Sequence, residues 1–103
     1  MDEIISPQMI LMGISEYYNI DLVDITSNVR CVEYILPRQM FTYLCREMTD
    51  LTLMEIAKIL NRPDHCNIFH DVMIMHKEKE RNEEVRKEIE DITFIIKTFY
   101  RKS

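Results

Sequence analysis

The stretch that decides the fold runs over residues 37–76 and has the sequence PRQMFTYLCREMTDLTLMEIAKILNRPDHCNIFHDVMIMH. Its apolar residues recur every three to four positions in three runs, which predicts three helices. The second run is short: it begins with a capping box between Thr52 and Glu55 and ends at the turn 61–63, where a proline disfavours helical geometry. Asp64 is a good N-cap for the third run. A short helix, a tight turn and a longer helix predict a helix-turn-helix.

Signals on either side of this stretch extend the helical pattern. Ser6-Pro7 is a typical helix start, Gly13 lies inside the helix that follows and marks close packing, and Asn82 is the predicted cap of the last helix. With one glycine and three prolines in 103 residues, the chain has few sharp turns. We predict an all-α fold: one domain over residues 1–103, six helices including a helix-turn-helix, and a long C-terminal helix. The expected helices cover residues 7–19, 22–26, 37–48, 53–60, 64–81 and 83–100, with a loop at 27–36.

The apolar periodicity also predicts which side chains face the core. In the second helix these are Leu22 and Ile25, and in the helix after the turn they are Ile68, Phe69, Val72 and Met75. Met73 and Ile74 do not fit the same inward stripe. Their apolar surface must therefore face another part of the protein or a partner.

Composition limits the function classes. The net charge is −5, with −6 over residues 1–76 and +1 over residues 77–103, which disfavours strong non-specific binding to phosphates. Three cysteines without a CxxC pair, no long apolar run and no basic leader predict a cytoplasmic protein with reduced thiols. Cys66 and His70 lie four residues apart but lack a third metal ligand, and no constellation of acid, base and nucleophile emerges. We expect no enzyme activity, no metal and no cofactor.

Three segments carry a resemblance to a known family: YYNIDLVDI, LPRQMFTYLCREMTDLTLMEIAKIL and RPDHCNIFH. Over about residues 10–96 the chain resembles the C-terminal DNA-binding domain (domain IV) of the bacterial replication initiator DnaA. The resemblance implies a Trp-repressor-like helix-turn-helix that places its second helix in the major groove of short duplex sites, with a basic loop and an arginine on the phosphates and minor groove. The GxxxxGK[ST] motif of the family's ATPase portion does not occur, so the chain, if complete, would be a stand-alone domain.

The resemblance also assigns roles to individual residues. Arg38 matches the minor-groove arginine, Arg30 remains from the basic loop, and Thr52 marks a helix start that offers amides to a phosphate. Asp64 and His65 match base-reading residues and His70 a backbone contact. From the residues themselves, Arg62 adds a phosphate contact and Asn67 can pair with adenine. The predicted DNA-binding set is Arg30, Arg38, Thr52, Arg62, Asp64, His65, Cys66, Asn67 and His70, although a plain surface or capping role remains open for each.

The chain departs from the family pattern in ways that support a second hypothesis. The loop SNVRCVEY keeps one basic residue, and Cys66 and Asn67 replace two hydroxyl residues. Met73-Ile74 replaces an Arg-Lys pair, and Asp71 adds a negative charge. Each lost phosphate contact weakens DNA binding. The alternative to a DNA-binding domain is therefore the same scaffold used for protein interaction or dimerisation through Met73, Ile74 or the C-terminal helix.

Overall fold

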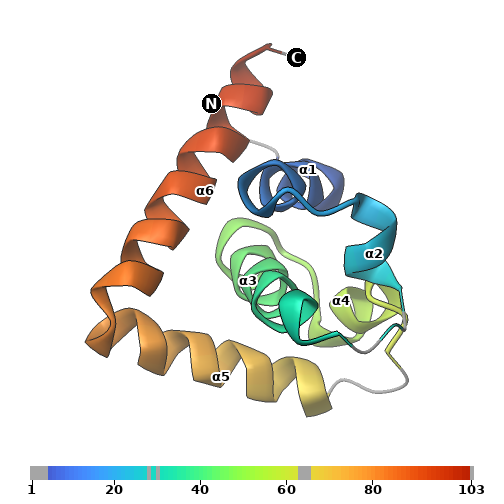
Figure 1. The fold of residues 1–103 in the computed structure, drawn as a ribbon. Helices are drawn as coiled ribbons and strands as arrows, with labels where there is room; N and C mark the ends of the chain where they lie inside the picture. Colours follow the sequence, from blue (N-terminus) through green and yellow to red (C-terminus); the bar gives the residue numbers. More distant parts are fainter. Residues whose placement is uncertain (1–4, 28, 30, 63–65, 103) are drawn as a thin grey trace.

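The computed structural model describes residues 5–27, 29, 31–62 and 66–102; for Cys66 and residues 100–102 it describes the backbone alone. Within these residues the chain forms six helices (Figure 1). They are α1 (Pro7–Tyr18), α2 (Leu22–Thr26), α3 (Val32–Met48), α4 (Leu53–Ile59), α5 (Cys66–Arg81) and α6 (Glu83–Lys102). The all-α prediction with a long C-terminal helix is confirmed. No helix in the described ranges has both the length and the hydrophobicity to cross a membrane.

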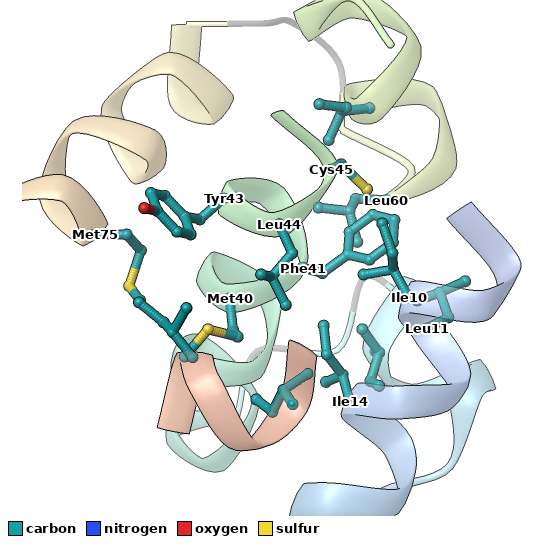
Figure 2. Packing of buried hydrophobic residues seen from close by; sticks show 14 of the residues in the cluster. Ile10, Leu11, Ile14, Met40, Phe41, Tyr43, Leu44, Cys45, Leu60 and Met75 are labelled. Atoms are coloured by element: carbon teal, nitrogen blue, oxygen red, sulfur yellow. The ribbon is translucent and has the colours of Figure 1, made fainter. Parts of the chain in front are cut away.

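Helix α3 lies at the centre of this arrangement. It packs against α1 on one side and against α5 on the other, and α6 closes the remaining side by packing on α1 and α5. Figure 1 shows α5 and α6 meeting at one corner, with α2 and α4 on the opposite side of the molecule. The core between them is built from side chains of all six helices, with Phe41, Tyr43 and Leu44 of α3 in its middle (Figure 2).

Local sequence signals fix the helix ends. The Ser6 hydroxyl accepts the N–H of Met9 at the start of α1, and Asn19 ends that helix with φ 57° and ψ 49°, a left-handed conformation that asparagine tolerates. The Asn82 side chain accepts from the N–H groups of Glu84 and Val85, so it separates α5 from α6 as predicted.

Gly13 brings α1 and α6 close together, as the sequence predicted. A Cβ atom built at this position would lie 2.6 Å from Cγ1 of Ile96. Since carbon atoms in contact normally lie about 3.5–4.0 Å apart, any larger residue requires the Ile96 side chain or one of the two helices to shift.

Three expectations about helix bounds and faces were wrong. Helix α3 begins at Val32, not at Pro37, which lies inside it. Proline within a helix removes a hydrogen bond and is unfavourable by about 3 kcal/mol, so contacts between this first turn and the rest of the fold must offset it. Phe69 is 56% exposed and Leu22 is also exposed. Each lies on a different side of its helix from a buried residue (Ile68 in α5, Ile25 in α2). A hydrophobic side chain was therefore not enough to place either residue in the core.

Candidate nucleic-acid interface

The turn that follows α4 is held by two backbone hydrogen bonds. Arg62 donates to the carbonyl of Ala57 (2.8 Å) and Asn61 donates to that of Lys58 (3.1 Å). Asn61 has φ 57°, and this pair of bonds around a left-handed residue is the Schellman motif. The Asn61 side chain also donates to the carbonyl of Thr26 (2.6 Å). The turn is therefore fixed both to α4 and to the end of α2.

The start of α4 is closed by the predicted capping box. The Thr52 hydroxyl accepts the N–H of Glu55 (3.1 Å), and the Glu55 carboxylate accepts the N–H of Thr52 (2.9 Å). The hydrogen bond from the Thr52 N–H to the carboxylate lowers the pKa of Glu55. A phosphate approaching this helix start would meet the Glu55 carboxylate, which repels it. The phosphate role of Thr52 stays a prediction, and the geometry gives it a capping role.

Helix α5 divides into an inner and an outer face. Ile68, Val72 and Met75 are buried against the rest of the fold. Asn67 and His70 are exposed on the other side, directly after the turn. Phe69 and Met73 are exposed as well, so this outer face carries both polar and apolar side chains.

Arg38 lies inside the protein and not on its surface. Its side chain is 6% exposed. The Nε group donates to the carbonyl of Ile25 (2.9 Å), and one Nη group donates to the carbonyls of Asp24 (2.9 Å) and Ser27 (3.0 Å). The guanidinium also lies 5.3 Å from the centre of the Tyr34 ring. Arg38 thus connects α3 to the C-terminal carbonyls of α2, where a cation is favoured.

Arg62 is the half-buried cation beside this connection. Burial and, after it, the positive charge of Arg62 lower the pKa of Arg38, because both disfavour the charged form of its guanidinium. Both line a shallow depression of 370 Å³ together with Cys31, Val32 and Ile35. Since Val32 and Ile35 are exposed, the surface around these two cations is largely apolar.

Asp71 faces inward, toward α3, and not outward with His70. The amide of Gln39 donates to its carboxylate (3.4 Å). Burial raises the pKa of Asp71, whereas the Gln39 hydrogen bond and the charge of Arg62 act in the opposite direction. The carboxylate of Asp71 therefore lies on the side of α5 that faces α3, hydrogen-bonded to Gln39.

The structure brings part of the predicted set together. Asn67 and His70 share the outer face of α5, and Arg38 and Arg62 share the depression. Arg30, Asp64 and His65 lie outside the described residues, and so does the side chain of Cys66. Sequence reasoning missed four participants: Asn61, Gln39 and the exposed pair Val32 and Ile35. The asparagine at the turn carried a signal, because asparagine favours left-handed helix ends.

Comparison with known proteins places this geometry in a family. The profile of the family described as "Bacterial dnaA protein helix-turn-helix" matches residues 7–74, from the start of α1 to the middle of α5. The matched range includes α4, the turn and the exposed residues of α5 described above.

Individual relatives agree with that match. The chromosomal replication initiator protein DnaA of Geobacter sp. (strain M21) is 31% identical over 88 residues, which are 85% of this chain and 19% of that protein. The protein of the same name from Caldanaerobacter subterraneus subsp. tengcongensis is 33% identical over 95 residues, 92% of this chain and 21% of the relative. The one from Ruegeria sp. (strain TM1040) is 33% identical over 86 residues. The chain spans about a fifth of the length of these relatives.

Proposed function

The chain belongs to the bacterial DnaA helix-turn-helix family, and from that membership and the geometry of α4 and α5 we propose that it binds double-stranded DNA with α5 in the major groove. The observation that carries the proposal is the exposure of Asn67 and His70 on the second helix of the motif, opposite the buried Ile68 and Val72. A major groove about 12 Å wide admits one α-helix. Packing against α3, α4 and α6 sets the orientation of α5.

Base recognition follows from the chemistry of the outer face. The Asn67 amide can donate to and accept from the N7 and N6 edge of adenine. His70 supplies a ring N–H for a base or a phosphate, and Asp64, His65 and Cys66 precede these residues along the chain. We propose sequence-specific binding to short duplex sites. Because the relatives are named chromosomal replication initiators, we further propose that these sites belong to a replication origin.

Few phosphates are held in this mode of binding. The Arg38 guanidinium already donates to carbonyls of α2 and its C-cap, and Met73 and Ile74 carry no charge. Arg62 and Arg30 would therefore supply most of the positive charge that contacts phosphates. Each phosphate contact contributes about 0.9 to the slope of log affinity against log salt. We expect a shallow slope, with a magnitude of about 2–3.

The test starts from duplexes enriched out of a randomised pool at about 50 mM salt, where phosphate contacts are strongest. Fluorescence anisotropy then measures affinity for the enriched duplex and for a scrambled one. Asn67→Ala should weaken binding to the enriched duplex by about 5–150-fold, the value of one bidentate base contact, with little change on the scrambled duplex.

Arg62→Ala should instead weaken both duplexes alike and lower the salt slope by about 1. Lys87→Ala removes the same charge from α6 and is the matched control. If neither Asn67→Ala nor Arg62→Ala changes binding, or if no duplex is enriched, the DNA proposal is wrong.

One observation favours a second function. Phe69 is 56% exposed and Met73 is 42% exposed, and the two lie one turn apart on α5. Two neighbouring apolar side chains on an outer face suit a protein partner, and Met73 stands where the family has a cation. In this alternative Met73→Asp abolishes co-purification of that partner and leaves DNA affinity unchanged. Loss of DNA affinity in the same variant assigns Met73 to the DNA surface.

A further inference from the structure

A second surface lies at the corner where α5 ends and α6 begins. It is a groove of 430 Å³, lined by Lys79 of α5 and by α6 residues that include Arg86, Ile89, Phe94 and Lys97. Phe94 is 72% exposed at its edge. In Figure 1 this corner lies on the opposite side of the molecule from α2 and α4. The groove is therefore separate from the candidate nucleic-acid interface.

The groove is positively charged although the chain as a whole is acidic. Lys79, Arg86 and Lys97 provide three cations and Glu90 provides one anion, whereas the whole chain has a net charge of −5. Arg86 is held in place because Nε donates to the carbonyl of Lys79 (3.2 Å) and an Nη donates to that of Glu80 (3.3 Å). An apolar floor with fixed cations fits an acidic segment that carries bulky apolar side chains.

The same chain presents such a segment at α2. Val23 is 74% exposed and the neighbouring Leu22 is also exposed. Asp21 directly precedes them and Asp24 directly follows, and Asp21 is exposed. We call residues 21–24 the α2 knob. An exposed apolar pair between two carboxylates matches the groove both in charge and in the kind of side chain it would bury.

We propose that the α2 knob of one copy binds the α5–α6 groove of a second copy. The two surfaces lie on opposite sides of one molecule (Figure 1). A contact between different surfaces of identical chains leaves one knob and one groove unused at the ends. The assembly therefore grows head to tail and does not stop at a closed dimer.

Sedimentation velocity of the 103-residue chain tests this, at protein concentrations from about 10 µM to about 1 mM, the range in which small transient interfaces form. The sedimentation coefficient should rise with protein concentration, and added salt should reverse the rise because the contact is partly ionic. Val23→Lys in the knob and Phe94→Glu in the groove should each give monomers throughout. Both positions are exposed, and circular dichroism checks that the variants remain folded.

Matched controls use the same chemical changes at other exposed sites. Val29→Lys replaces another exposed valine and Met12→Glu replaces an exposed apolar residue of α1; both should assemble like the unaltered chain. A mixture of Val23→Lys and Phe94→Glu retains one intact knob and one intact groove, so it should form dimers and nothing larger. The proposal is overturned by an unaltered chain that stays monomeric, by assembly that stops at a dimer, or by controls that act as strongly as the test variants.

Discussion

Replacing Arg38 with alanine should destabilise the fold before it affects any ligand. The guanidinium is buried and donates to three carbonyls, those of Asp24, Ile25 and Ser27, at 2.9–3.0 Å. Alanine leaves these carbonyls without their donor and opens a space between α2 and α3. The side chain that the family resemblance assigned to the minor groove is thus a connection between two helices.

The size of the effect follows from those three bonds. Hydrogen bonds to charged groups contribute about 1.5–3 kcal/mol each, and an unsatisfied buried group costs about 1–3 kcal/mol. Carbonyls at a helix end regain some hydration, so we expect Arg38→Ala to lower the free energy of unfolding by about 2–4 kcal/mol. A chain of this length has about 5–15 kcal/mol in total. The midpoint of thermal unfolding should fall by about 10–25 °C.

Urea unfolding followed by far-UV circular dichroism measures the change. Arg38→Lys keeps the charge but loses the forked donor geometry, so its loss should be intermediate. Arg46→Ala is the control, because Arg46 is exposed and makes one hydrogen bond, to the carbonyl of Leu51 (3.1 Å); its loss should stay below about 1 kcal/mol. If Arg38→Ala unfolds like the unaltered chain yet binds duplex DNA more than tenfold more weakly, the connection argued above is wrong and Arg38 is a DNA contact.

Other positions give independent checks. Gly13→Ala should destabilise by about 1–2 kcal/mol through its contact with Ile96, and in an Ile96→Ala background it should instead stabilise by up to about 1 kcal/mol from helix propensity. Calorimetry of the unaltered chain, the two single variants and the double variant separates the two effects. The folded pKa of Glu55 lies below its ordinary value of 4.5, so its contribution to stability is complete above about pH 4.5 and is lost as the pH falls through the folded pKa; urea midpoints of the unaltered chain and Glu55→Gln should converge in acid. Burial raises the pKa of Cys45 to about 12, so at about pH 8 a thiol reagent should label Cys45 only on unfolding, as peptide mass analysis of labelled protein measures.

Patterns that depend on neighbours in the chain predicted much of this fold. The capping box at Thr52, the serine before α1 and the asparagine before α6 each involve residues within four positions, and all three caps are confirmed. The apolar residues Val85, Ile89, Ile92, Ile96 and Phe99 recur every three to four positions, which predicts one inward stripe of α6. The first four are buried and Phe99 is half-buried. Local hydrogen bonds and helical periodicity leave few alternatives at such sites.

Features that depend on distant contacts could not be predicted in this way. Pro37 is a strong local signal for a helix start, yet α3 begins one and a half turns earlier, at Val32. The partners of Arg38 are 11 to 14 residues away, and no spacing rule connects them. Phe69 was predicted to lie in the core because it is large and apolar. Its position on α5, however, lies away from the buried Ile68 and Val72, so its side chain is exposed. For Pro37 and Arg38, tertiary geometry outweighed the local preference.

The burial of Arg38 and the inward direction of Asp71 together change how the acidic charge of this chain should be understood. The net charge of −6 over residues 1–76 counts all ionised groups equally, whether or not they face the surface that would contact a ligand. Asp71 instead accepts a hydrogen bond from Gln39 of α3, and Glu55 closes the start of α4. The outer face of α5 around Asn67 is therefore less negative than the sum suggests, and its exposed residues Phe69 and Met73 carry no charge. In the binding mode proposed above, affinity for a duplex would come mainly from base edges, and a binder of that kind discriminates between sequences more than it attracts DNA in general.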